Sequence, residues 1–246
     1  MWQEGVAGFL LWPAMTDTAS RFLQQTLAQS APVVFMDRPI PGLNYPCVAT
    51  DHYQGAVLAV EHLIGLGHRD ITFVSRPHLD LWPIAERLRG YESAMRAAGL
   101  TPRPPLLVGQ SAELPPASAR RAYQEARGQE ISELQVLLRQ PERPTAIFAM
   151  NDLMALQVLR AATLTQLKIP DELSVVGFDD LEIVSHVEPP LTTVVQDPFS
   201  MGAEAARCLI DMVHGNRPAD LLNLLPARLI VRASTGAAQR GQNQPE

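Results

Sequence analysis

The chain has 246 residues, of which 46% are hydrophobic and 19% are charged. This balance is typical of globular proteins with room for one large or two modest domains, and it excludes a chain that is disordered throughout. The 20 Lys and Arg residues stand against 26 Asp and Glu residues, for a formal net charge of -6. The chain therefore lacks the basic surface with which most proteins hold nucleic acid.

Apolar runs and helical patterns alternate along the first half of the chain. Short apolar runs predict strands at 6–12, 31–36, 48–50 and 71–74. Apolar spacings of three to five residues predict helices from 18 onward, over 51–66 and over 86–98. Gly67 and Gly99 follow two of these helices, where a positive φ angle ends a helix.

The second half of the chain continues the alternation. Strands are predicted at 106–108, 146–149, 174–178 and 191–195, and short apolar runs recur over 221–231. Helices are predicted over 117–139, after an Asn151 N-cap, and from Asp197 and Pro198 to 214. The pattern predicts an α/β fold with parallel sheets and helices on both faces. The polar tail, 237–246, is predicted to be disordered.

The stretch 174–198 places polar side chains directly after two predicted strands. The first strand ends at Asp179 and Asp180, and the second ends at Gln196. Ligands of open α/β sheets bind beyond the carboxyl ends of strands, so this stretch predicts a binding crevice. Adjacent carboxylates tend to diverge, which disfavours a catalytic acid pair. The residues alone leave a ligand role and an ordinary turn role equally open for the two aspartates.

Motifs for catalysis or cofactor binding are missing from the sequence. It holds neither a phosphate-binding loop nor a nucleophile elbow, and Gly65-Leu66-Gly67 follows a helix, where it reads as a helix stop. The 6 histidines and 2 cysteines lack metal-ligand spacing. We therefore expect no catalytic residue, no metal site and no cofactor. The two cysteines are expected to be reduced thiols.

No apolar run reaches membrane-spanning length, and the start of the chain lacks the basic region of a signal peptide. A cytoplasmic protein without a membrane partner is therefore expected, provided that Met1 is the true start.

Several segments, in matching order, resemble the effector-binding domain of the LacI/GalR family of bacterial transcription regulators. The segments are VVFMDRP (33–39), TDHYQGAVLAVEHLIGLGHRDITFV (50–74), ERLRGYESAMRAAGL (86–100), PTAIFAMNDLMALQVLRA (144–161) and IPDELSVVGFDD with PPLTTVVQD (within 169–197). The resemblance implies two Rossmann-like subdomains of the type I periplasmic-binding-protein fold. The N-terminal subdomain would comprise 1–49 and 197–225, and the C-terminal one 51–195 and 226–236.

Members of the family begin with a DNA-binding helix-turn-helix, a hinge and two further βα units, which this sequence lacks. The N-terminal subdomain is therefore expected to be incomplete. Missing strands leave apolar sheet and helix surface uncovered, so we expect a chain of marginal stability that tends to aggregate.

The resemblance also implies an effector site, residue by residue. The ligand-binding positions carried over are Asp37, Arg87, Asn151, Asp179 and Gln196. Some relatives add an aromatic ring where this sequence has Gln110 and Ser111, and Trp82 is a possible replacement. Three alternatives stay open: Asn151 as a plain N-cap, Arg87 as a surface residue, and Trp82 as a packed tryptophan.

The function implied is that of the ligand sensor of a regulator of repressor type, in which a small sugar or purine bridges the two subdomains. The implied partners are the effector, a second copy of the chain, for which the helix over 51–66 is a plausible contact surface, and operator DNA through a headpiece that this chain lacks. One alternative is a stand-alone or periplasmic sugar-binding protein, which upstream sequence would distinguish. The other is an enzyme on the same scaffold, which no motif supports.

Overall fold

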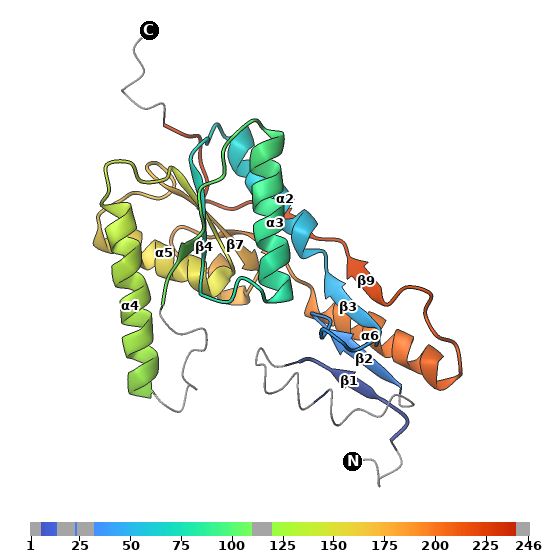
Figure 1. The fold of residues 1–246 in the computed structure, drawn as a ribbon. Coiled ribbons are helices and arrows are strands. Elements are labelled where there is room, and N and C mark those ends of the chain that lie inside the picture. The colour runs from blue at the N-terminus through green and yellow to red at the C-terminus, as the bar shows by residue number, and fades with distance from the viewer. Residues whose placement is uncertain (1–5, 14–22, 24–31, 110–119, 240–246) are drawn as a thin grey trace. The chain divides into compact units, whose positions relative to one another are not determined.

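The chain divides into two units, each built on its own sheet (Figure 1). The structure, a computed structural model, describes residues 6–13, 23, 32–109 and 120–239. Unit 1 comprises Met1–Asp51, Leu81–Pro83 and Asp197–Ala227. Unit 2 comprises His52–Asp80, Ile84–Gln196 and Arg228–Glu246.

The sheet of unit 1 has four parallel strands in the order β1-β2-β3-β9. Their bounds are β1 Phe9–Leu11, β2 Val33–Met36, β3 Cys47–Thr50 and β9 Leu222–Leu225. The amphipathic helix α6, Pro198–Val213, packs against β1, β2 and β3. Because strand side chains alternate between faces, Val34 and Val48 join Met201 and Ala205 of α6 in one cluster, while Val33, Phe35 and Cys47 belong to a second.

The sheet of unit 2 has six strands in the order β10-β8-β7-β6-β4-β5. Their bounds are β4 Ile71–Ser75, β5 Leu106–Leu107, β6 Ala146–Ala149, β7 Ser174–Asp179, β8 Thr192–Val195 and β10 Arg228–Ile230. The four strands β4, β6, β7 and β8 are buried at nearly every position, as expected for a parallel sheet between helices. The rings of Phe73, Phe148 and Phe178 are fully buried in this core.

Four α-helices accompany the second sheet, and a short 3-10 helix, η2, spans Glu182–Ser185. Their bounds are α2 His52–Gly65, α3 Trp82–Ala97, α4 Arg120–Leu138 and α5 Asp152–Leu164. Helix α2 contacts β8 and β10, and α5 contacts β6 and β7. Helices α4 and α5 pack on each other at one side of the sheet (Figure 1).

Two predicted helix starts are confirmed by their caps. The Oδ1 atom of Asn151 accepts a hydrogen bond from Met154 N at 2.9 Å, which makes Asn151 the N-cap of α5. Asp197 likewise accepts from Ser200 N at 3.0 Å, with Pro198 at the first helical position of α6. Both caps satisfy backbone N–H groups that a helix start leaves without internal partners.

Three boundaries differ from the sequence-based expectation. Helix α3 begins at Trp82, four residues before the predicted start at Glu86, because Pro83 fits the first turn of a helix rather than a loop. The apolar stretch 221–231 forms two strands in different sheets, β9 and β10. The tail is held as far as Ala238, whose N–H donates to Leu66 O at 2.9 Å.

Strand β10 also departs from the expectation of purely parallel sheets, because it pairs antiparallel with β8. The chain leaves unit 2 at the end of β8 and returns to it at the start of β10. Two neighbouring strands that carry the chain out of a unit and back into it must run in opposite directions.

Part of the prediction lies outside the described residues. This holds for most of the helix expected from 18 onward, for Gln110 and Ser111, for the first residues of the helix predicted over 117–139, and for the tail from 240. Within the described part, no helix is both long and apolar enough to cross a membrane.

Candidate functional site

Unit 2 brings polar groups together where three neighbouring strands end. Met150 follows β6, Asp179 is the last residue of β7, and Gln196 follows β8. The strands are parallel neighbours in the order β8-β7-β6, so their carboxyl ends lie at one edge of the sheet. The predicted crevice position is therefore occupied by backbone and side-chain oxygens from all three strands.

Arg87 of α3 donates to these oxygens. Its Nη1 donates to the carbonyl oxygen of Met150. Its Nη2 lies 3.5 Å from Asp179 Oδ1 and 3.3 Å from Gln196 Oε1. Arg87 is only 4% exposed, so its charge is held inside the unit by these acceptors rather than by bulk water. Arg87 is thus a buried residue of the cluster, and the alternative of a surface arginine is wrong.

Two rings support the Arg87 guanidinium. Its Cζ atom lies 3.7 Å from the centroid of the Phe178 ring, a cation–π geometry. The His52 Nδ1 atom lies 3.4 Å from Arg87 Nε and 3.3 Å from Nη2, so the ring accepts from the guanidinium. The His52 and Phe178 ring centroids are 5.5 Å apart. Sequence reasoning did not single out His52, although its place at the start of the 52–65 helix was a usable signal.

The two adjacent aspartates have different partners. Asp179 faces Arg87, whereas Asp180 Oδ1 accepts from Arg232 Nη2 at 2.7 Å. Their backbone φ angles are 123° and 58°, both in the region that residues other than glycine rarely adopt. The divergence expected from the sequence is confirmed, and Arg232 is a second residue of this region that sequence reasoning missed.

The chemistry of this cluster suits a small polar ligand. The Asp179 side chain is 26% exposed, so solvent or a ligand reaches a carboxylate that already lies beside a guanidinium. Carboxylate oxygens accept from hydroxyl groups, while guanidinium and amide N–H groups donate to hydroxyl or ring oxygens. The group of Arg87, Asp179 and Gln196 therefore offers both donors and acceptors at one edge of one sheet.

Asn151 directly follows Met150 in the sequence and caps helix α5. Its Oδ1 caps α5, as described above. Its Nδ2 makes no hydrogen bond with any residue that the structure describes. The capping role is thus shown, and a ligand role for the amide nitrogen remains a prediction.

The other two predicted site residues belong to unit 1. Asp37 follows β2 with a φ of 76°, and its Oδ2 lies 3.8 Å from Arg38 Nη1, both side chains being almost fully buried. Burial lowers the pKa of the Arg38 guanidinium, and Asp37 beside it partly offsets this. Trp82 packs against the unit 1 cluster that contains Phe35 and Cys47, as the alternative of a packed tryptophan predicts. A ligand role for Asp37 or Trp82 remains a prediction.

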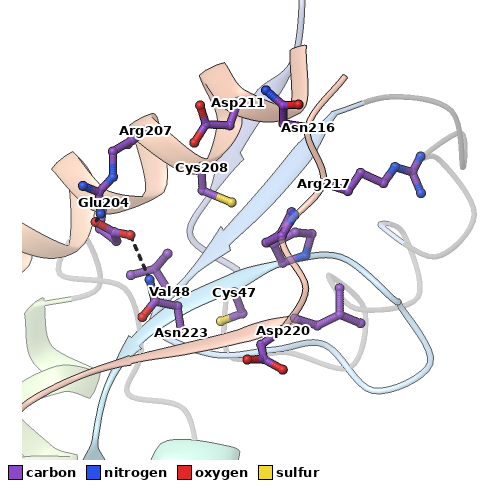
Figure 2. A pocket seen from close by; sticks show the side chains of 13 residues that line it. Cys47, Val48, Glu204, Arg207, Cys208, Asp211, Asn216, Arg217, Asp220 and Asn223 are labelled. Carbon is purple, nitrogen blue, oxygen red and sulfur yellow. Dashed lines mark hydrogen bonds and ion pairs between the residues drawn. The ribbon is translucent and has the colours of Figure 1, made fainter. Parts of the chain in front are cut away.

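A pocket lies elsewhere in unit 1, near the starts of β3 and β9 and beside α6 (Figure 2). Its volume is about 460 Å³. Glu204 joins Arg207 and Asn223 on its wall, with Asn223 Nδ2 donating to Glu204 Oε1 at 2.9 Å. None of the six predicted site residues lines it. It lies at the amino ends of the strands, the edge opposite to the one where open α/β sheets bind ligands.

Cys47 and Cys208 also line this pocket, and both are free cysteines. Burial raises the pKa of the Cys47 thiol to about 12 and raises that of Cys208 as well. Thiols with raised pKa values stay protonated at neutral pH and are poor nucleophiles. In the described part of the chain, no three His, Cys, Asp or Glu residues are placed to hold a metal ion.

Comparison with known proteins identifies the family to which the fold belongs. Residues 60–235 match the family model described as a periplasmic binding protein-like domain. The chain is 33% identical to the HTH-type transcriptional repressor CytR of Escherichia coli (strain K12) over 207 residues, which are 84% of this chain and 56% of that protein. The chain thus spans little more than half the length of this relative.

Two solved structures are similar over most of the chain. A regulatory protein of the LacI family from Chloroflexus aggregans is 32% identical, with a TM-score of 0.78 over 96% of this chain and 79% of that one. A LacI family transcriptional regulator from Enterococcus faecalis V583, solved with bound ribose, is 26% identical, with a TM-score of 0.72 over 96% and 79%.

The fold and the family model define this chain as a periplasmic-binding-protein-like domain. Within that class, the chain belongs to the LacI family, which confirms the resemblance drawn from the sequence. The relatives named above are transcriptional regulators.

Proposed function

We propose that this chain is the effector-sensing part of a LacI-family transcriptional regulator and that unit 2 contacts a small polyhydroxylated ligand through Arg87, Asp179 and Gln196. One observation carries the proposal. Two strand-end side chains and a buried guanidinium converge at one sheet edge, and one of them, Asp179, is partly exposed. Buried polar groups joined in this way hold a fixed geometry, which a specific site needs.

A sugar is the ligand class that fits this geometry best. Hydroxyl groups donate to the Asp179 carboxylate and accept from guanidinium or amide N–H groups, so one ligand satisfies both kinds of group. The relative from Enterococcus faecalis was solved with bound ribose. Ribose is therefore the first probe, followed by hexoses, nucleosides and purines.

The remaining parts of the proposal concern the whole regulator. Ligand binding favours one of two conformational states, and that preference changes operator binding. A net charge of -6 gives no overall basic footprint for DNA, which supports assigning operator contact to another part of the regulator. The regulator acts as a symmetric dimer and in the cytoplasm, and the chain is a binding protein rather than an enzyme.

Calorimetric titration of the 246-residue chain against the probes tests the proposal. We expect Asp179→Asn and Gln196→Ala each to weaken the binding of a probe that the wild type binds. Loss of a hydrogen bond to a charged group costs about 1.5–3 kcal/mol, or about 10- to 150-fold in affinity, and the neutral Gln196 contact should cost less.

Arg87→Ala is compared with Arg96→Ala, because Arg96 lies on the same helix with a side chain that is 62% exposed. We expect the first substitution to abolish measurable binding and the second to leave it unchanged. Equal affinity in wild type, Asp179→Asn and Gln196→Ala would refute the site. If the wild type binds none of the probes, the proposal that the ligand is a sugar or a purine is refuted.

A further inference from the structure

A buried carboxylate lies behind the turn that carries Asp179. Asp152, the first residue of α5, is fully buried. Its Oδ1 accepts from Thr193 Oγ1 of β8 at 2.5 Å, and its Oδ2 accepts from Leu181 N at 2.8 Å. One side chain therefore ties the start of α5 to β8 and to the segment that follows β7.

The neighbouring strand leaves room for this carboxylate. Gly177 of β7 has no side chain, and a Cβ atom built there would lie 2.3 Å from Asp152 Oδ1 and 2.8 Å from a methyl carbon of Leu191. Such distances are far below van der Waals contact, so only glycine fits at this position while the carboxylate keeps its place. The glycine in the strand is explained by the space that Asp152 needs.

The turn that Asp152 contacts holds an unfavourable backbone conformation. Asp179 and Asp180 are consecutive residues with positive φ angles, and neither is glycine. Such a conformation persists only where surrounding contacts determine it. Here those contacts are Leu181 N to Asp152, Arg232 to Asp180 at 2.7 Å, and Gln196 N to Asp179 O at 3.2 Å.

We infer that Asp152 is a positioning residue for the ligand site: its ionised carboxylate accepts from Leu181 N and thereby holds the Asp179–Leu181 turn in the conformation that presents Asp179. The inference rests on the proposed function for its link to ligand, whereas the support of the turn is independent of it. Asp152 touches no ligand in this account, because its side chain is enclosed by β7, β8 and the turn.

The charge on Asp152 is held at a cost to stability. Burial raises its pKa to about 6, the nearby Asp180 adds to this, and the hydrogen bonds from Thr193 and Leu181 and the charge of Arg87 oppose it. A buried group that would be more stable when neutral is a poor choice for packing alone. Its hydrogen bond to Leu181 N is strongest when the carboxylate is ionised, because charged acceptors form stronger hydrogen bonds.

Exchange of the Leu181 amide hydrogen, followed by NMR in the unliganded chain, tests the support of the turn. We expect Asp152→Ala to speed exchange at pH 7 about tenfold or more and Asp152→Asn to restore part of the protection, because its Oδ1 still accepts. Asp171→Asn, at an exposed aspartate of the same unit, is the control and should change nothing. Unchanged exchange in Asp152→Ala would overturn the inference.

The pH profile separates positioning from a merely structural role. After correction for the intrinsic rate, protection of Leu181 in the wild type should fall as the pH drops from 7 to 5, following the Asp152 carboxyl signal. The same profile should be flat in Asp152→Asn. A wild-type profile that is also flat would contradict the role of the ionised carboxylate.

Ribose titration of wild type and Asp152→Asn then tests the link to ligand. We expect Asp152→Asn to weaken ribose binding severalfold, although no Asp152 atom contacts the sugar. Equal affinity, with the Leu181 profile as expected, would overturn the ligand role and keep the support of the turn. If the wild type does not bind ribose, the same comparison is made with the hexose, nucleoside or purine that it binds. Failure of the wild type to bind any of them would count against the proposed function, while the Leu181 profile would still decide the role of Asp152.

Discussion

Each unit is built on its own, mostly parallel sheet, and the two sheets differ in size and in how much of them is buried. In unit 2, strands β6 and β8 are buried at every position and β7 at all but the last. In unit 1, the central strands β2 and β3 are buried almost as fully, whereas the edge strands β1 and β9 are half-buried or exposed, as are the edge strands β5 and β10 of unit 2. The described part of unit 1 thus has two strands with a neighbour on each side and unit 2 has four, which gives unit 2 the larger core.

Helix α6 extends the contrast. Its apolar side chains include Phe199, which is 84% exposed, and Ile210, which is 57% exposed. Strained and buried polar groups occur in both units. Unit 1 has the positive φ angle of Asp37 beside the buried Arg38, and unit 2 has the turn at Asp179 beside the buried Arg87. Such groups persist only where the surrounding contacts fix their conformation.

The largest expected effect comes from a matched pair of phenylalanines, one in each unit. Phe148→Ala, at a fully buried ring of unit 2, should lower the free energy of unfolding by about 3–5 kcal/mol. Phe199→Ala, on the exposed face of α6, should change it by about 0.5 kcal/mol or less. Hydrogen exchange with mass spectrometry in increasing urea reads the two units separately. Equal losses would contradict the exposure of Phe199 on the outer face of α6.

The next effect is the pH dependence caused by Asp152 in unit 2. Its pKa in the folded chain, about 6, is higher than its ordinary value of 3.8, so the stability that it contributes is complete below pH 3.8 and is lost as the pH rises through 6. Between pH 4 and 7 the loss amounts to about 2 kcal/mol. Urea unfolding of Asp152→Asn should therefore show no such decrease in the free energy of unfolding between pH 4 and 7. An unchanged pH dependence would mean that Asp152 does not titrate in this range.

The arrangement of elements in both units was predictable from local patterns. The starts of α5 and α6 follow from an Asn or Asp cap, and for α6 from a proline at the first position. The cluster of Arg87, Asp179 and Gln196 was predictable only through the family resemblance, because the three residues lie on separate elements of one unit.

What escaped prediction depends on contacts between distant residues. His52 supports Arg87 across 35 positions, and Arg232 holds Asp180 across 52. Asp152 reaches Thr193 across 41 positions, and Gly177 is explained by that carboxylate together with the Leu191 side chain. No local pattern encodes such pairs, because each residue taken alone also fits a cap, a surface position or a strand.

A smaller pH effect of opposite sign is expected from the buried His68 of unit 2. Its ring contacts Thr145 and Ser174, and its Nε2 lies 3.1 Å from the carbonyl oxygen of Gly236. Burial lowers its pKa below the ordinary value of 6.5; the hydrogen bond to Gly236 opposes this, and His62 adds to it. Its contribution to stability is therefore complete above pH 6.5 and is lost as the pH falls through the lower folded value.

We expect His68→Ala to lower the free energy of unfolding by about 1–3 kcal/mol at pH 8, because buried hydrogen bonds are lost. The variant should also lose less stability than the wild type as the pH falls below 6.5. Urea unfolding at several pH values measures both. His214→Ala, at an exposed histidine of unit 1, is the control. A cost that does not shrink toward low pH would show that protonation of His68 is not responsible.

The smallest effect concerns the thiols of unit 1. Cys47 is 1% exposed with a pKa raised to about 12, whereas Cys208 is partly exposed. Iodoacetamide at pH 8 should label Cys208 faster than Cys47 by on the order of tenfold, because Cys47 reacts only when unit 1 opens. The variants Cys47→Ala and Cys208→Ala assign the two rates. Equal rates would show that unit 1 opens freely.

The central claim is that ligand contacts the cluster at the strand ends of unit 2, and NMR titration tests it most directly. With a probe that calorimetry shows to bind, the largest shifts should appear at the Arg87 Nε–H, the Gln196 side-chain amide and the backbone amides of the Asp179–Leu181 turn. Shifts confined to unit 1, for example around Glu204 and Asn223 in its pocket, would contradict the account.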